Sequence, residues 1–226
     1  VYAKPSDKLT VERLWNAVEK GKGGPSKLIA ATGTYTFAKP NQLSDAEKAA
    51  SGTYVVVVAN LKANGAAELV GRELRGVRGV KTIVVNLDSD VVLHEDAIVN
   101  MVAAFENDQD LIAATGAVEI RPESGSSGFM KVIHECEFQE YYFGFNVGRR
   151  FESRARSLFT LAGAFSAFRR DVLLNTYLYD TSTVGEDTFM TFELQELFPD
   201  KHVSVVTASV CYTDPIPSLR ALYAQR

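Results

Sequence analysis

The chain has 226 residues, of which 46% are hydrophobic and 23% are charged, and its formal net charge at pH 7 is −4. This composition is typical of a soluble protein that buries a sizeable core, in one large domain or two small ones. The negative balance argues against a general nucleic-acid-binding protein, because such proteins usually present a basic face.

Helix-like and strand-like segments alternate along the first half of the chain. The clearest strand is TYVVVVAN, which is rich in β-branched residues and is bounded by Gly52 and Asn60. The patterns predict helices over residues 6–24, 65–77 and 94–107, a short helix or loop over 44–52, and strands over 27–40, 53–60 and 81–90.

The second half of the chain begins with a strand and a long, aromatic-rich helical segment. The patterns predict a strand over residues 110–122, a helix over 128–153, an apolar turn leading into a helix over 157–176, a helix over 185–198, and one long strand or a strand pair over 201–214. Strands that alternate with helices indicate an α/β domain with a largely parallel sheet. Near-continuous apolar strands favour a sheet that is covered on both faces.

Two carboxylates stand one residue apart at the end of the strand TIVVNLDSD. In open α/β sheets, ligands bind beyond the carboxyl ends of the strands, which is where Asp88 and Asp90 lie. Side chains at i and i+2 of an extended segment point the same way, and paired hard oxygen ligands suit Mg²⁺ or Mn²⁺. The alternative is that both residues only cap a turn or a helix.

A second acidic pair, Glu186 and Asp187, follows Gly185 at a junction between a loop and a helix. An ionised carboxylate near a metal-bound substrate could act as a general base for an attacking hydroxyl. Acids in the first turn of a helix are also favoured by the helix dipole, so capping alone could explain them.

An apolar turn over residues 158–170 contains the small residues Ala162, Gly163 and Ala164. Small residues allow the backbone to approach a ligand closely, and backbone N–H groups at the start of a helix can bind an oxygen-rich ligand. The flanking aromatics could form a stacking platform for a sugar ring: Phe159, Phe165 and Phe168. The alternative is a tightly packed helix start in the core.

Four motifs follow one another along the chain: DSD, LAGAFSAFRR, GED and the terminal DPIPSLRALYAQR. Together they resemble the catalytic domain of family-two glycosyltransferases. The resemblance is to the processive group of cellulose, chitin, hyaluronan and poly-N-acetylglucosamine synthases, especially to membrane-bound members from Gram-positive bacteria. It implies a GT-A fold, which is an α/β domain with a mainly parallel mixed sheet flanked by helices.

The resemblance implies a role for each acidic motif. Asp88 and Asp90 would bind Mg²⁺ or Mn²⁺ together with the diphosphate of a UDP-sugar. Asp187, with Glu186 beside it, would be the catalytic base that deprotonates the acceptor hydroxyl. The reaction would be an inverting, metal-dependent transfer of a sugar to a saccharide acceptor in polysaccharide synthesis.

The resemblance also implies an acceptor site and a closing motif. Ala162, Gly163 and Ala164 would line the acceptor site. Gln225 and Arg226 match the start of the family's Q-x-x-R-W motif, which closes over donor and acceptor.

The N-terminal third matches the family only in part. The resemblance implies a single domain over residues 1–226 that is truncated at both ends. Residues 80–226 would carry the metal, acceptor and base motifs, and residues 1–79 would be the weakly matched nucleotide-binding part. Within that part, Asp7 stands at the acidic position of the family's second turn, and Lys62 precedes an alanine-rich helix. The resemblance assigns both residues to the donor site.

Two other functions remain open from the sequence: a nucleotidyltransferase, and a degenerate sugar-nucleotide-binding domain without catalysis.

Cys136 and Cys211 form no CxxC pair or Cys/His cluster, so they are expected to be two reduced, buried thiols. No apolar run reaches the roughly 18 residues of a membrane helix. We therefore expect this segment to be soluble, and its acidic balance predicts no nucleic-acid partner. The resemblance implies that it lies on the cytoplasmic face of the membrane, within a parent protein that is membrane-embedded beyond this segment.

Overall fold

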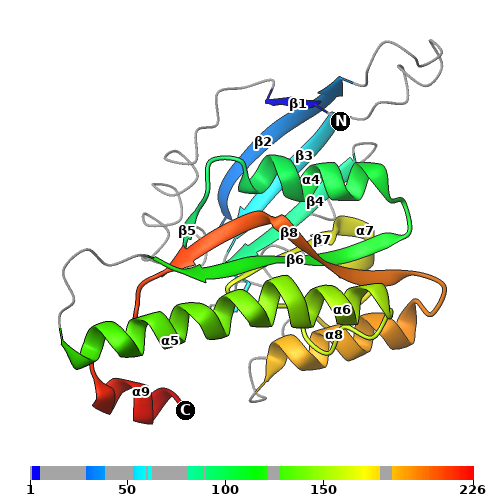
Figure 1. Ribbon diagram of the computed structural model, residues 1–226. Coiled ribbons are helices and arrows are strands. Elements are labelled where there is room, and N and C mark those ends of the chain that lie inside the picture. Colours follow the sequence, from blue (N-terminus) through cyan, green and yellow to red (C-terminus); the bar gives the residue numbers. More distant parts are fainter. Residues whose placement is uncertain are drawn as a thin grey trace.

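The computed structural model describes residues 2–5, 29–38, 53–59, 61–62, 81–88, 90–121, 128–178 and 185–226. The described strands form one eight-stranded sheet in the order β1-β2-β3-β4-β7-β6-β8-β5 (Figure 1). These strands are β1 Tyr2–Pro5, β2 Ile29–Ala38, β3 Thr53–Ala59, β4 Lys81–Leu87, β5 Val92–Leu93, β6 Leu111–Ile120, β7 Phe165–Arg169 and β8 His202–Thr213.

Helices flank this sheet, as the sequence predicts for an α/β domain. They are α4 Ala97–Asn107, α5 Phe129–Phe143, the π-helix η3 Gly144–Arg149, α6 Arg150–Arg154, α7 Arg170–Leu173, α8 Glu186–Leu197 and α9 Leu219–Gln225. α5, η3 and α6 run on from one another and confirm the long helix predicted over 128–153. The helices predicted over 6–24 and 65–77 lie outside the described residues.

The sheet is mixed, as expected, but fewer of its ladders are parallel than the sequence indicates. β3 pairs with β4 in parallel, as β6 does with β8, whereas the other ladders between the described strands are antiparallel. Two of the antiparallel ladders come from β7, which enters between β4 and β6 and runs antiparallel to both. The sequence pattern predicts a turn and a helix start there, and this prediction is wrong for residues 165–169, which form a strand.

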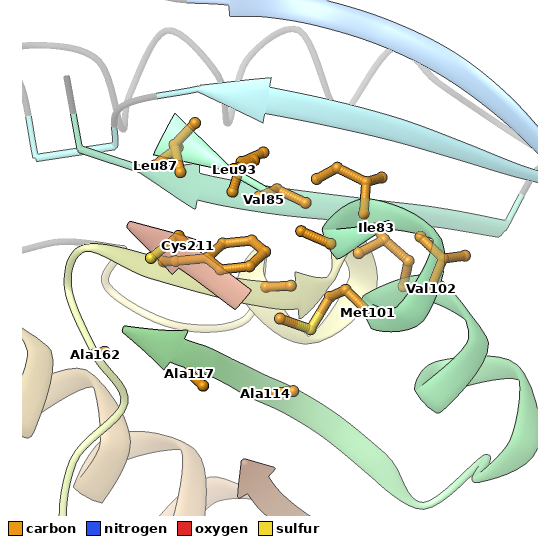
Figure 2. Packing of buried hydrophobic residues seen from close by; sticks show 14 of the residues in the cluster. Ile83, Val85, Leu87, Leu93, Met101, Val102, Ala114, Ala117, Ala162 and Cys211 are labelled. Atoms are coloured by element: carbon orange, nitrogen blue, oxygen red, sulfur yellow. The ribbon is translucent and has the colours of Figure 1, made fainter. Parts of the chain in front are cut away.

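One face of the sheet packs against α4. Ile83, Val85 and Leu87 alternate along β4 and contribute to a buried cluster that includes Met101 and Val102 from α4 (Figure 2). Successive side chains of a strand point to opposite faces, so this spacing assigns every second residue of β4 to the α4 side. Each such fully buried aliphatic side chain contributes about 1.5–3 kcal/mol.

The other face packs against α8. Val84, the intervening residue of β4, belongs to a second buried cluster with Phe168 from β7, Leu173 from α7, and Met190 and Leu194 from α8. Both faces are therefore covered, as the apolar strands predicted. This packing fixes the N-terminus of α8 beside the carboxyl end of β4, which is where the acidic motifs lie.

Two further expectations concern cysteines and membrane segments. Cys211 is buried, as predicted, but Cys136 on α5 is exposed, which corrects the expectation that both thiols are buried. None of the helices in the described part of the chain has the length and apolarity to cross a membrane.

Candidate active site

The carboxyl end of β4 is joined to the loop that precedes β7. Asp88, the first residue after β4, donates its backbone N–H to the carbonyl oxygen of Ala164 over 3.1 Å. Its side chain is about a quarter exposed, whereas Asp90 is exposed. Both carboxylates lie at the carboxyl edge of the sheet, as the sequence predicts.

A buried amide, Asn86, connects three segments of the site. Its Oδ1 accepts a hydrogen bond from the backbone N–H of Leu61 over 2.9 Å, and its Nδ2 donates to the carbonyl oxygen of Gly163 over 2.8 Å. Sequence reasoning missed this residue, although a polar side chain in an otherwise apolar strand is a recognisable signal. Asn86 places Lys62, the residue after Leu61, next to the small-residue loop.

Lys62 lies among three carboxylates that come from two motifs. Its Nζ is 3.1 Å from Asp88 Oδ2, 3.8 Å from Glu186 Oε1 and 3.7 Å from Asp187 Oδ2. Burial disfavours the ammonium ion, but attraction to Asp187 and Asp88 outweighs burial and raises the pKa of Lys62. One ammonium faces three carboxylates, so this group carries excess negative charge that a divalent cation would neutralise.

The N-terminus of α8 holds Asp187 against residues 160–161. Thr191 Oγ1 donates to the carbonyl oxygen of Asp187 over 2.7 Å and accepts from the N–H of Leu161 over 2.9 Å. Thr188 and Thr160 hydroxyls are 3.2 Å apart. These bonds fix the first turn of the helix relative to the loop, and therefore orient the Asp187 side chain.

Gly163 leaves the space that the charged groups occupy. A Cβ added there would lie 2.1 Å from Asp187 Oδ2 and 2.3 Å from Lys62 Nζ. Both distances are well inside van der Waals contact, so a glycine is required for this arrangement. The small residues of the LAGA segment thus bring the backbone close to the side chains of Asp187 and Lys62.

The environment of Asp187 suits a general base. Burial raises the pKa of Asp187 to about 6, and Lys62 opposes this while the carboxylates of Glu186 and Asp88 reinforce it. Burial also raises the pKa of Asp88, again against the effect of Lys62. A general base is most effective when its pKa lies near the working pH, so a carboxyl with a pKa of about 6 could serve in that role near neutral pH.

This pKa predicts how stability depends on pH in the metal-free chain. The folded-state pKa of about 6 exceeds the unfolded value of about 3.9, so the folded chain binds Asp187's proton more tightly. Protonation of Asp187 therefore adds to the free energy of unfolding below about pH 4. This contribution, which is at most about 3 kcal/mol, is lost as the pH rises to about 6. Asp187→Asn should raise the melting temperature at pH 7.5 and have little effect at pH 4. The exposed Asp200→Asn is the matched control, and equal responses of both variants would contradict the assignment.

A cavity of about 600 Å³ opens beside these groups. Its walls come from the ends of β4, β6 and β8, the loop before β7, the start of α8 and the α5–η3 helix. The residues that line it include Asp88, Asp90, Asp187, Thr160, Ala162, Gly163, Ala164, Tyr141, Phe145, Arg149 and Arg226. The cavity thus gathers residues from all four of the sequence motifs. Arg149 and Tyr141 were not foreseen, because they lie in a helix whose sequence gives no sign of a site.

The remaining predicted residues lie in different places. Arg226 also lines the cavity and forms an ion pair with Glu140 on α5. Gln225 is the last residue of α9. Asp7 lies outside the described residues.

The proposed aromatic platform is wrong for two of its three members. Phe165 and Phe168 are fully buried in β7 and pack in the two cores on opposite faces of the sheet. They are unavailable to a sugar because β7 is a central strand. Phe159 is exposed and packs edge-on against Phe192 of α8, with 5.4 Å between ring centroids.

Comparison with known families decides which protein class has this site. A family model described as "Glycosyltransferase like family 2" matches residues 22–226. The chain belongs to glycosyltransferase family 2. The domain is thus a glycosyltransferase, and its mixed sheet with flanking helices is the expected GT-A fold.

Curated relatives of this glycosyltransferase domain are polysaccharide synthases. The poly-β-1,6-N-acetyl-D-glucosamine synthase of Staphylococcus epidermidis is 28% identical over 140 residues, which are 62% of this chain and 32% of that protein. The synthase of the same name from Staphylococcus aureus strain COL is 28% identical over 108 residues, or 48% of this chain and 25% of that protein. The chain therefore spans a third or less of the length of these relatives.

A solved structure with a similar chain is a mannosyltransferase from Pyrobaculum calidifontis in complex with GDP-Man and Mn²⁺. It is 20% identical, with a TM-score of 0.48, and the match covers 72% of this chain and 39% of that one. Staphylococcus aureus TarS gives a TM-score of 0.39 at 14% identity, over 71% of this chain and 26% of that one.

Proposed function

We propose that this domain transfers a sugar from a UDP-sugar to a saccharide acceptor, with inversion, and that the transfer depends on Mg²⁺ or Mn²⁺. The observation that carries the proposal is the meeting of two acidic motifs about 100 residues apart. Asp88 and Asp187 share one ammonium partner, Lys62, at 3.1 and 3.7 Å, and both line one cavity.

The residues present fit a divalent cation. In the described part of the chain, no group of three or more His, Cys, Asp or Glu side chains is arranged to bind a metal by itself. Mg²⁺ and Mn²⁺ sites in phosphate-handling enzymes usually take one or two carboxylates and complete the shell with water and substrate phosphates. Asp88 and Asp90, with hard oxygen atoms on the cavity wall, would bind the cation, which would supply positive charge to the leaving diphosphate.

Asp187 would then remove the proton from the acceptor. As the hydroxyl oxygen bonds to the anomeric carbon, its O–H bond breaks and the proton passes to Asp187, while the bond from that carbon to the phosphate oxygen breaks and UDP leaves. Attack from the face opposite the leaving group inverts the anomeric centre. Lys62 keeps the carboxylates in position before substrate binds, through its contacts at 3.1 to 3.8 Å.

The class of product comes from the relatives. Since both Staphylococcus proteins are poly-β-1,6-N-acetyl-D-glucosamine synthases, we infer that the donor is UDP-N-acetylglucosamine and the acceptor a β-1,6-linked N-acetylglucosamine chain. The parent protein would act in polysaccharide synthesis at the cytoplasmic face of the membrane. The suitable probes are UDP, UDP-N-acetylglucosamine and a β-1,6-linked N-acetylglucosamine trisaccharide.

Isothermal titration of UDP with and without Mn²⁺ tests this proposal directly. The native chain should bind UDP only with Mn²⁺, and Asp88→Asn/Asp90→Asn should weaken that binding by at least about 100-fold, because two charge-assisted ligands are lost. Asp96→Asn/Asp108→Asn, at the two ends of α4, is the control and should bind UDP normally. Binding that needs no Mn²⁺, or that survives in the Asp88/Asp90 variant, would contradict the proposal. Release of pyrophosphate instead of UDP during turnover would identify a nucleotidyltransferase.

A further inference from the structure

The π-helix η3 places an arginine on the cavity wall. Arg149 is its last residue, and the guanidinium carbon lies 4.2 Å from the ring centroid of Phe145, four residues earlier. Phe145 is itself only 7% exposed, so the ring is a fixed support for the planar cation. π-helical turns inside α-helices are frequently found at functional sites. Here the turn directs Phe145 and Arg149 to the cavity.

One nitrogen of this guanidinium is buried and unpaired. Among the described residues, Arg149 Nη1 has no hydrogen-bond partner. An arginine stays charged in proteins and has only donors to offer, so a buried donor without an acceptor costs free energy. Burial lowers the pKa of Arg149 from its ordinary value, and attraction to Glu152 and Asp187 partly offsets this. The guanidinium of Arg149 is charged, is stacked on a buried ring, and has one nitrogen without a hydrogen-bond acceptor. A ligand oxygen can supply that acceptor.

An unpaired acceptor belongs to another residue that lines the same cavity. Asp187 Oδ1 is also buried and has no hydrogen-bond partner among the residues that the structure describes. The charge of Arg149 acts on Asp187, since it lowers the pKa of that carboxyl against the effect of burial. Two residues that line the cavity, Arg149 and Asp187, therefore each carry a buried polar atom without a partner among the described residues. A saccharide, whose hydroxyl groups donate and accept hydrogen bonds, can partner both groups once their side chains turn toward it.

We propose that Arg149 binds the acceptor saccharide, donating from its guanidinium to an acceptor oxygen next to the hydroxyl that Asp187 deprotonates. This inference rests on the proposed function and adds the residue that positions the acceptor. The donor diphosphate belongs at the end of β4 with Asp88 and Asp90, whereas Arg149 enters from the α5–η3 helix and lies close enough to Asp187 to act on its charge. The arginine thus belongs to the acceptor side of the cavity.

The test separates acceptor binding from donor binding. The β-1,6-linked N-acetylglucosamine trisaccharide is titrated into the chain saturated with UDP and Mn²⁺, and UDP is titrated separately. Arg149→Gln should weaken trisaccharide binding by about tenfold or more, as expected for a lost charged hydrogen bond, and leave UDP affinity unchanged. Arg149→Lys keeps the charge but loses the planar fork, so an intermediate loss is expected. The neighbouring exposed Arg150→Gln is the matched control and should bind both ligands normally.

Each outcome decides the proposal. Unchanged trisaccharide affinity in both Arg149 variants, or no trisaccharide binding by the native chain, would overturn it. A loss of UDP affinity as large as the loss of trisaccharide affinity would place Arg149 at the diphosphate and overturn it as well. Failure of the native chain to bind UDP with Mn²⁺ would instead contradict the proposed function, so the two failures are distinguishable. Variants whose melting temperatures are not below that of the native chain show that the losses of affinity arise at the site.

Discussion

Asp187→Asn should lower kcat by about 10²- to 10⁴-fold, because an amide cannot accept the proton of the attacking hydroxyl. The amide has the same shape as the carboxylate, so the backbone bonds that fix Asp187 to Thr191 remain. UDP affinity in the presence of Mn²⁺ should change little. The measurement is the rate of UDP release from UDP-N-acetylglucosamine with the trisaccharide as acceptor.

Glu186→Gln is the matched control for this prediction. Glu186 precedes Asp187 on the same turn of α8, has similar exposure and lies at 3.8 Å from Lys62. It does not line the cavity, so its loss should reduce kcat by less than about tenfold. Similar rates in both variants, or a nearly native rate in Asp187→Asn, would show that Asp187 is not the base.

Gly163→Ala should reduce kcat/KM by about 100-fold or more while changing the melting temperature little. The new methyl group would overlap Asp187 Oδ2 and Lys62 Nζ, at 2.1 and 2.3 Å. Both atoms are at the ends of side chains that can rotate away, so the fold tolerates the change. The base and its ammonium partner are then misplaced, and a displacement of about 1 Å can cost about 100-fold in rate.

Gly148→Ala provides the comparison, because it adds the same methyl group in open space. The nearest atom to that added Cβ would be Phe143 O at 3.8 Å, which is ordinary contact. Activity and melting temperature should both stay close to native values. If Gly163→Ala were equally active, the close approach at Gly163 would have no part in catalysis.

Most strands and helices could be predicted from the sequence, because they carry clear patterns. β7 could not, for a physical reason. Phe165 and Ala167 pack on one face of the sheet while Phe168 packs on the other, and Ser166 is buried as well. A strand buried on both faces has no alternation of polar and apolar residues. With the small residues before it and two arginines after it, the segment resembles a turn and a helix start.

The candidate site was predictable where chemistry is concentrated in short motifs and not where it depends on tertiary structure. Asp88 and Asp187 stand out as acids at the ends of elements. Arg149 does not, because its direction depends on a π-helix that shifts the register of the following residues relative to an α-helix. Lys62 was placed near the donor by resemblance, but its contacts with three carboxylates depend on Asn86, 24 residues further along the chain.

Asn86 has a consequence for how the site can diversify. Both of its hydrogen bonds are made to main-chain atoms, the N–H of Leu61 and the carbonyl oxygen of Gly163. A main-chain N–H is present in every residue except proline, so the bond to residue 61 excludes only proline there. Substitutions in the loops around the cavity can therefore alter which sugar fits while the frame that aligns the charged groups persists. The frame itself depends on one amide side chain, which must offer an acceptor to one loop and a donor to the other.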